Sequence, residues 1–182
     1  MRYINLFFLT IKNPLKIFIF IIIAFLLFLP ACGYHFPGYG TSLPPDIVTI
    51  SIPIFKNQTL VPSLENIVTD SVIKRFLMGG RLKVVNSGGD VLLIGNIRSF
   101  SENPISFNRD GIVIESRVSM VLDLTLKRKD NEQVLKKESL TETWVYGVVE
   151  DILTSEKKRF YSFKKIADDL ADRIYDWTFE GF

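Results

Sequence analysis

The chain has 182 residues, 47% of them hydrophobic, which is enough for one domain of ordinary size. Three of its 22 basic residues precede Cys32 and none of its 20 acidic residues does, so the chain from Cys32 onward is close to neutral. This balance argues against a nucleic-acid-binding protein, which would need an excess of Lys and Arg on one face. The single cysteine excludes an intramolecular disulfide and a thiolate-based metal site.

Residues 17–29 form an uncharged apolar run that follows three basic side chains. A helix of this length measures about 20 Å, which is short of the ~30 Å hydrocarbon layer of a membrane. A true membrane anchor would have to include residues 3–11 as well, and the polar segment 12–16 interrupts that longer stretch. The pattern therefore favours a secretory signal peptide over a membrane span.

The apolar run ends in "LPAC" at residues 29–32, which resembles the bacterial lipobox. In such lipoproteins a diacylglycerol is attached to the cysteine sulfur, and cleavage leaves the modified cysteine as the first residue. We predict a removed signal peptide at residues 1–31, a diacylglycerol and an acyl chain on Cys32, and a lipidated tether at residues 32–46. Several acyl chains hold a domain stably on a bilayer. Gly33, in place of Asp, is typical of lipoproteins sorted to the outer membrane.

The folded domain is predicted to span residues 47–182. Residues 47–55 are rich in β-branched side chains and favour a strand. An amphipathic helix is predicted from residue 64 to the Gly79-Gly80 pair, with Ser63 as its cap. Residues 81–86 and 90–100 then favour extended structure, either as one bulged strand or as a small hairpin.

The clearest pattern in the chain is the alternation of residues 112–127, which predicts a long strand with one polar face. Its polar side chains are expected on an open sheet face: Glu115, Arg117, Asp123, Thr125 and Lys127. A turn at residues 129–132 leads into a return strand at 133–147. A helix over residues 154–177 closes the domain, with an apolar stripe made of Phe160, Phe163, Ala167, Leu170, Ile174 and Trp177. This order predicts an α+β fold, a two-layer sandwich of two helices on one face of a mostly antiparallel four-stranded sheet.

Residues for catalysis or metal binding are scarce. The only histidine, His35, lies three residues from Cys32 and outside the domain, so no nucleophile–histidine arrangement can be built. Asp168, Asp169 and Asp172 follow one another on the last helix, where a solvated face explains them better than a metal site. We predict no metal, no further cofactor and no enzymatic activity. A carboxylate pair for acid–base chemistry stays open from sequence alone.

Several motifs together resemble the LptE family of lipopolysaccharide-assembly lipoproteins. They are "LPACGYHF" at the start, "IVTISIPIFKNQT" running into "PSLENIVTDSVIKRFL", a long strand entered through "SFNRDG", and "KKIADDLADRI" in the closing helix. The resemblance implies an outer-membrane lipoprotein on the periplasmic side, with a helix-on-sheet fold. It also implies that the protein sits inside the β-barrel translocon LptD, helps that barrel assemble and binds lipopolysaccharide. A polar sheet face suits a barrel interior, which is lined by polar side chains.

The resemblance further suggests three ligand-binding residues. Arg109, in "FNRDG", is similar to a family arginine implicated in lipopolysaccharide binding, and a guanidinium suits phosphate geometry. Lys157 and Lys158 lie roughly where the family has a second such basic residue. An ordinary turn arginine and a solvated helix face are the alternatives at these positions.

Three function classes stay open at this point. The first is a translocon plug of the LptE kind. The second is a lipoprotein scaffold of another envelope machine, which would share the anchor and fold without binding glycolipid. The third, a lipoprotein enzyme, is disfavoured by the missing nucleophile and histidine.

Overall fold

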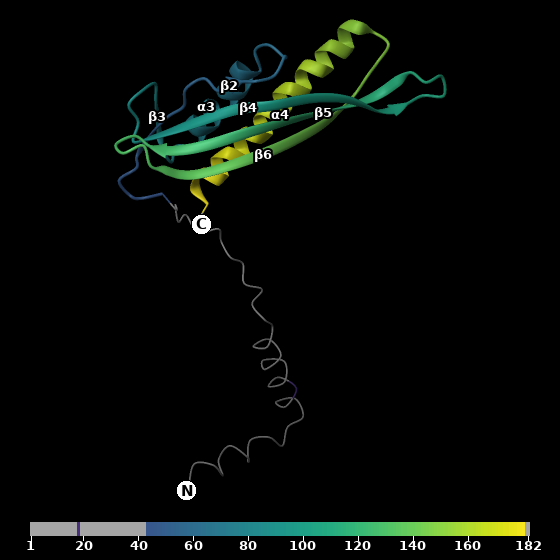
Figure 1. Ribbon diagram of the computed structural model, residues 1–182. Helices are drawn as coiled ribbons and strands as arrows, with labels where there is room; N and C mark the ends of the chain where they lie inside the picture. Colours follow the sequence, from purple (N-terminus) through teal and green to yellow (C-terminus); the bar gives the residue numbers. More distant parts are fainter. Residues whose placement is uncertain (1–17, 19–42, 181–182) are drawn as a thin grey trace. The chain divides into compact units, whose positions relative to one another are not determined.

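Three long antiparallel strands form most of the sheet (Figure 1). β4 (Val91–Phe107) pairs with β5 (Val113–Arg128), and β5 pairs with β6 (Val134–Gly147). The computed structural model describes residue 18 and residues 43–180, and the latter range lies within one compact unit. Cys32, the rest of the predicted tether up to residue 42 and, apart from residue 18, the predicted signal peptide lie outside the described residues. The long strand and its return strand are confirmed to within a residue or two at their ends.

The sheet nevertheless differs from the prediction of four mostly antiparallel strands. It has six strands in a mixed arrangement, with the order β3-β1-β4-β5-β6 and with β2 beside β4. The three short strands, β1 (Thr49–Ser51), β2 (Lys56–Asn57) and β3 (Lys83–Val85), all pair in parallel. The predicted strand at residues 47–55 is thus interrupted after Ser51, because the chain leaves the ladder there and rejoins β4 further along.

The segments on either side of the Ser87-Gly88-Gly89 sequence form neither a bulged strand nor a hairpin. β3 and β4 lie on opposite sides of β1, so that Ile50 pairs with Val84 on one side and with Val91 on the other. The connection between them must therefore pass close to β1. A Cβ atom at Gly89 would lie 2.7 Å from the backbone nitrogen of Ser51, which explains the glycine at this crossing.

Asp90 fixes this crossing through hydrogen bonds to β1. Its carboxylate accepts from the backbone N–H groups of Val48 and Thr49, at 3.0 and 2.8 Å. The Thr49 hydroxyl also donates to it, and this bond is the largest cause that holds the pKa of Asp90 below its usual value. The parallel part of the sheet therefore depends on contacts between residues about 40 positions apart, which no local pattern reveals.

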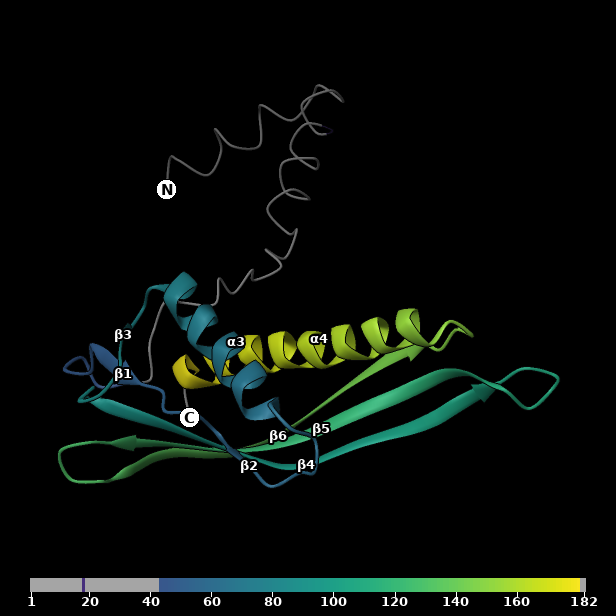
Figure 2. The same cartoon turned by 90° about the horizontal axis from the view of Figure 1, so that it is seen from above.

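Two helices lie on the same side of the sheet (Figure 2). α3 (Leu64–Gly79) begins after Ser63 as predicted, although the Ser63 side chain makes no capping hydrogen bond. Gly80 ends the helix in the left-handed conformation, and its N–H donates to the Phe76 carbonyl. α4 (Ile152–Phe179) is longer than predicted at both ends, and the Asp151 carboxylate caps its start. Two helices on one face of a sheet confirm the α+β class.

The core lies between these helices and the alternating side chains of β5. Every second residue of β5 from Val118 to Leu126 is fully buried, and Ile166, Leu170 and Ile174 of α4 are fully buried as well. The opposite parity faces away from the helices and carries the polar residues that the sequence placed on an open face. Of these, Glu115 and Arg117 are exposed, and Asp123, Thr125 and Lys127 are half-buried.

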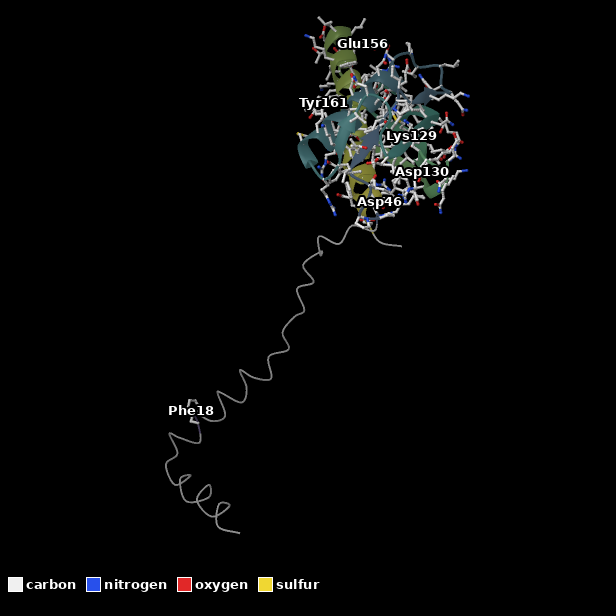
Figure 3. The ribbon with its side chains drawn as sticks, turned by 90° about the vertical axis from the view of Figure 1, so that its left-hand side faces the viewer. Phe18, Asp46, Lys129, Asp130, Glu156 and Tyr161 are labelled. Carbon is white, nitrogen blue, oxygen red and sulfur yellow. The ribbon has the colours of Figure 1, made fainter. Side chains whose placement is uncertain are left out.

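The domain has two ends that differ in character. At one end, where the described chain begins, Asp46 forms an ion pair with Arg128 beside the turn that holds Lys129 and Asp130 (Figure 3). The β4–β5 hairpin projects from the opposite end (Figure 1). A strand the length of β4 spans about 55 Å at ~3.3 Å per residue. We call residues 105–114 and 148–161, which lie at the hairpin end, the distal end.

Candidate functional site

The hairpin turn at the distal end is built by Asn108. Its side-chain carbonyl oxygen accepts from the backbone N–H groups of Asp110 and Ile112, at 2.9 Å each, and its own N–H donates to the Ile112 carbonyl. Gly111 completes the turn with φ at +74°, a conformation that favours glycine. The ordered turn presents Arg109 to solvent, and within the described residues its guanidinium forms no ion pair.

Large apolar side chains are exposed on both parts of the distal end. On the hairpin, Phe107 and Ile112 are 56% and 52% exposed. On α4, Ile152 and Phe160 are 78% and 61% exposed. The other exposed apolar side chains in this region are Ile105, Ile114, Val149, Leu153 and Tyr161. Because apolar patches of this kind on soluble domains mark sites that contact a partner or a lipid, this end is the candidate functional site.

The first turns of α4 are held in place mainly by polar contacts. No residue of α4 before Ser162 is buried. The Ser155 hydroxyl accepts from the Val149 N–H and donates to the Val149 carbonyl, at 3.0 and 2.9 Å. Further along, the Arg159 guanidinium donates to Glu102 of β4 at 2.8 Å. The helix therefore extends beyond the core while staying attached to the sheet.

Glu102 joins three elements beneath this part of α4. Besides Arg159, its carboxylate accepts a hydrogen bond from the Tyr146 hydroxyl on β6. Burial of the ring is the main cause that raises the pKa of Tyr146 from 10.0 to about 12, and the Glu102 hydrogen bond contributes. Next to this network, the rings of Phe100 and Phe163 meet edge to face, with 4.9 Å between their centroids.

The three predicted ligand residues lie at the distal end but do not form one cluster. Lys157 is exposed on α4, whereas Lys158 is half-buried over the sheet. A Cβ atom at Gly147 would lie 3.9 Å from the Lys158 ammonium, and Gly147 pairs with Glu115. The hairpin turn that carries Arg109 is roughly 15 Å further along β5. Any ligand that contacts all three cations has to extend over that distance.

The charge of the distal end is balanced. Its four basic residues, Arg109, Lys157, Lys158 and Arg159, are matched by four acidic ones, Asp110, Glu150, Asp151 and Glu156. Arg159 is already paired with Glu102, and the Asp151 carboxylate caps α4. Arg109, Lys157 and Lys158 form no ion pair within the described residues and are therefore the cations that stay available for an anionic group. The exposed apolar side chains lie on the same two segments of the distal end.

Sequence reasoning missed these apolar residues as site candidates. The predicted apolar stripe of the last helix includes Phe160, and the apolar parity of the predicted long strand includes Ile112, yet both side chains are exposed. Their spacing matches that of core residues. They are exposed because the core ends before they are reached, and the sequence pattern does not show where the core ends.

The described residues offer little for catalysis or metal binding. They contain neither cysteine nor histidine, and they hold no group of three or more Asp or Glu side chains placed to bind a metal ion. Asp168, Asp169 and Asp172 each pair with a basic side chain, namely Lys164, Lys165 and Arg75. Within the same residues, no helix is both long enough and apolar enough to cross a membrane.

The fold is similar to several solved structures. One is the rare lipoprotein B from Shewanella oneidensis, with 15% identity and a TM-score of 0.54 over 71% of this chain and 92% of that one. Another is a protein from Xanthomonas campestris, with 13% identity and a TM-score of 0.53 over 74% and 88%. A hypothetical protein from Chlamydia trachomatis follows, with 7% identity and a TM-score of 0.50 over 72% and 98%. At these identities the similarity concerns the fold alone.

Comparison with curated proteins finds no match. Residues 47–176, in contrast, match the sequence model of the family LptE, described as lipopolysaccharide-assembly. The match covers well over half of the chain and runs from the segment before β1 almost to the end of α4. The chain therefore belongs to the LptE lipopolysaccharide-assembly family.

Proposed function

We propose that this protein is a non-enzymatic, lipid-anchored component of lipopolysaccharide assembly in the outer membrane. In this role it partners an LptD-like β-barrel through its open sheet face and binds lipopolysaccharide at its distal end. The single observation that carries the lipopolysaccharide contact is the combination of exposed apolar side chains with the available cations Arg109, Lys157 and Lys158. An amphiphile with acyl chains and phosphates needs both kinds of contact.

The partnership with a barrel is supported by the polarity of the open face. Side chains of β5 alternate between the buried core and this face, where Arg117 is exposed and Asp123 half-buried. A surface of this kind suits the polar interior of a barrel. Family membership is the second support, and it favours this role over a scaffold of another envelope machine.

Lipopolysaccharide binding is tested with purified domain and lipopolysaccharide micelles. Arg109→Glu should weaken binding by about tenfold, because it replaces a charge-assisted contact with repulsion. Phe107→Ser should weaken it by loss of apolar contact area. Leu60→Ser is the matched control, since Leu60 is fully exposed outside the distal end. Equal binding by all three variants would show that the distal end is not the lipopolysaccharide site.

The partner and the anchor are tested in cells. The chain carrying an affinity tag should co-purify with the LptD-like barrel of its own organism, whereas a scaffold of another machine would not.

Cys32→Ala should abolish labelling by radioactive palmitate and leave a longer precursor. Labelling that persists in this variant would rule out Cys32 as the lipid attachment site.

A further inference from the structure

Large apolar side chains are also exposed at the end of the domain opposite the distal end. Leu77 and Met78, on the last turn of α3, are 62% and 67% exposed, and Val48, just before β1, is 60% exposed. α3 ends on the side of the domain where β1 and β3 lie (Figure 2). Residues 80–82 lead from α3 into β3, where the Lys83 N–H donates to the Val48 carbonyl at 2.9 Å. The roles proposed for the open face and the distal end leave these side chains unexplained.

Basic side chains flank these apolar residues. Lys74, Arg81 and Lys83 are exposed, and none of them forms an ion pair within the described residues. The Arg81 guanidinium lies over the Phe179 ring, 4.0 Å from its centroid, which positions the side chain without neutralising its charge. We call this surface the entry patch, and it consists of Val48, Lys74, Leu77, Met78, Arg81 and Lys83.

The carboxylates of this end leave the entry patch with an excess of positive charge. Three of them are held by an arginine or by β1: Asp46, Asp172 and Asp90. Two more line a hollow between β6 and α4, and so face away from α3: Asp176 and Glu180. Asp70, one turn before Lys74, is the remaining acidic residue on this part of α3. Three basic side chains of the patch are thus set against one carboxylate.

The predicted tether limits how far the entry patch can lie from a membrane. Residues 32–42 reach at most about 38 Å when fully extended, at ~3.5 Å per residue. β4 carries the distal end roughly 55 Å further away. An acyl chain on Cys32 therefore keeps the entry end of the domain near the leaflet that holds the anchor. The tether contains no acidic residue, so it does not supply the opposite charge for the patch.

We propose that the entry patch binds the surface of the phospholipid leaflet in which Cys32 is anchored. Leu77 and Met78 enter the headgroup region, and the basic side chains contact anionic phosphates. Apolar side chains flanked by Lys and Arg are typical of surfaces that bind an anionic bilayer. The inference rests on the proposed function, since it requires the lipid anchor. Its consequence is a fixed orientation of the domain, with the distal end directed away from that leaflet.

The test uses the purified, acylated chain in vesicles of phosphatidylethanolamine and phosphatidylglycerol. Because a diacylglycerol on Cys32 blocks the native thiol, Met78→Cys provides a single thiol for the environment-sensitive fluorophore NBD. Its emission should shift to shorter wavelength and be quenched by nitroxide-labelled phospholipids. Leu60→Cys is the matched control, since Leu60 is fully exposed in the loop before α3, and a fluorophore there should not be quenched.

A second pair of variants tests the role of charge. Lys74→Glu combined with Arg81→Glu should reduce occupancy of the membrane contact at least about fivefold, because each basic side chain near an anionic surface contributes a factor of this size. Quenching at position 78 should fall accordingly, and it should also fall in vesicles that lack phosphatidylglycerol. The same change of charge at the distal end, Arg109→Glu with Lys157→Glu, should leave the quenching unchanged.

The outcomes separate this inference from the proposed function. An acylated, vesicle-bound chain without quenching at position 78, or with equal quenching at positions 60 and 78, would overturn the inference and leave the anchor standing. A purified chain whose mass shows no acyl groups would overturn the anchor, and the inference with it. Quenching at position 78 that disappears in the complex with the LptD-like barrel, in the same vesicles, would assign the entry patch to the barrel, and the inference would be wrong.

Discussion

The two ends of β5 show how one sequence pattern can have two outcomes. From Val118 to Leu126 the apolar parity lies beneath the helices, and Leu122 is fully buried. At the distal end the same parity continues through Ile114 to Ile112, just before β5, and these two side chains are 40% and 52% exposed. The alternation specifies which face each side chain belongs to, whereas burial depends on where the helices lie. An apolar residue beyond the helices is thus available to bind a ligand.

This contrast is tested most strongly by placing an aspartate at one buried and at one exposed position of the apolar parity. Leu122→Asp should destabilise the domain by more than ~4 kcal/mol and unfold it, because a carboxylate would be buried without a partner. Ile112→Asp should change stability by less than ~1 kcal/mol, because its side chain is already in water. Urea denaturation followed by circular dichroism measures both variants. If the two variants were equally destabilised, the hairpin residues around Ile112 would be part of the core.

The same comparison applies to two phenylalanines one turn apart on α4. Phe163 is 7% exposed and packs against Phe100, whereas Phe160 is 61% exposed. Phe163→Ala should cost about 3 kcal/mol of unfolding free energy, in the range for large core truncations. Phe160→Ala should cost less than ~0.5 kcal/mol and should instead weaken lipopolysaccharide binding. A large stability loss in Phe160→Ala would place the start of α4 in the core.

A pH titration probes the network that joins α4 to the sheet. The pKa of Tyr146 is raised to about 12 in the folded protein, above the 10.0 of an unperturbed tyrosine. The stabilisation linked to its proton is therefore fully present below about pH 10 and is lost as the pH rises through about 12. Because the group is partly exposed, we expect the loss to be roughly 1 kcal/mol.

Tyr146→Phe is the control for this titration. It removes the titrating hydroxyl, so the decrease in stability between pH 10 and 12 should shrink compared with the wild type. Chemical denaturation at a series of pH values gives the two curves. Parallel curves would show that the Tyr146 proton does not contribute to stability over this pH range.

A feature of the fold could be predicted from the sequence where it depends on residues that are close together in the chain. The polar and apolar faces of β5 and the ends of α3 at Ser63 and Gly80 were predicted, because each depends on residues close together in the chain. The parallel pairing of β1 with β3 and β4 was not, because it depends on contacts such as those between Asp90 and Thr49. At the site, Arg109 was suggested by family resemblance, while the exposure of Ile112 requires knowledge of where the helices lie.

The open face of the sheet has no helix over it, whereas the outer edge of β6 is protected by α4. Arg173 of α4 donates to the backbone carbonyl of Thr141 at 2.7 Å and to the Glu142 carboxylate at 2.8 Å. The Thr141 carbonyl thus points away from β5. Since inward and outward backbone groups alternate along an antiparallel strand, those of Thr143 point outward as well. The Thr143 N–H in fact donates to the Glu142 carboxylate at 3.4 Å.

The Arg173–Glu142 pair therefore occupies two backbone groups, the Thr141 carbonyl and the Thr143 N–H, through which an edge strand would pair with another molecule. Arg173→Ala should leave these groups open, with a stability loss of less than ~1 kcal/mol, as for a partly exposed ion pair. The variant should self-associate at concentrations where the wild type is monomeric, as measured by sedimentation velocity. Arg98→Ala, which removes an ion pair on the open face instead, should not self-associate. If both variants stay monomeric, the edge is protected by the charged side chains of β6 itself, without help from α4.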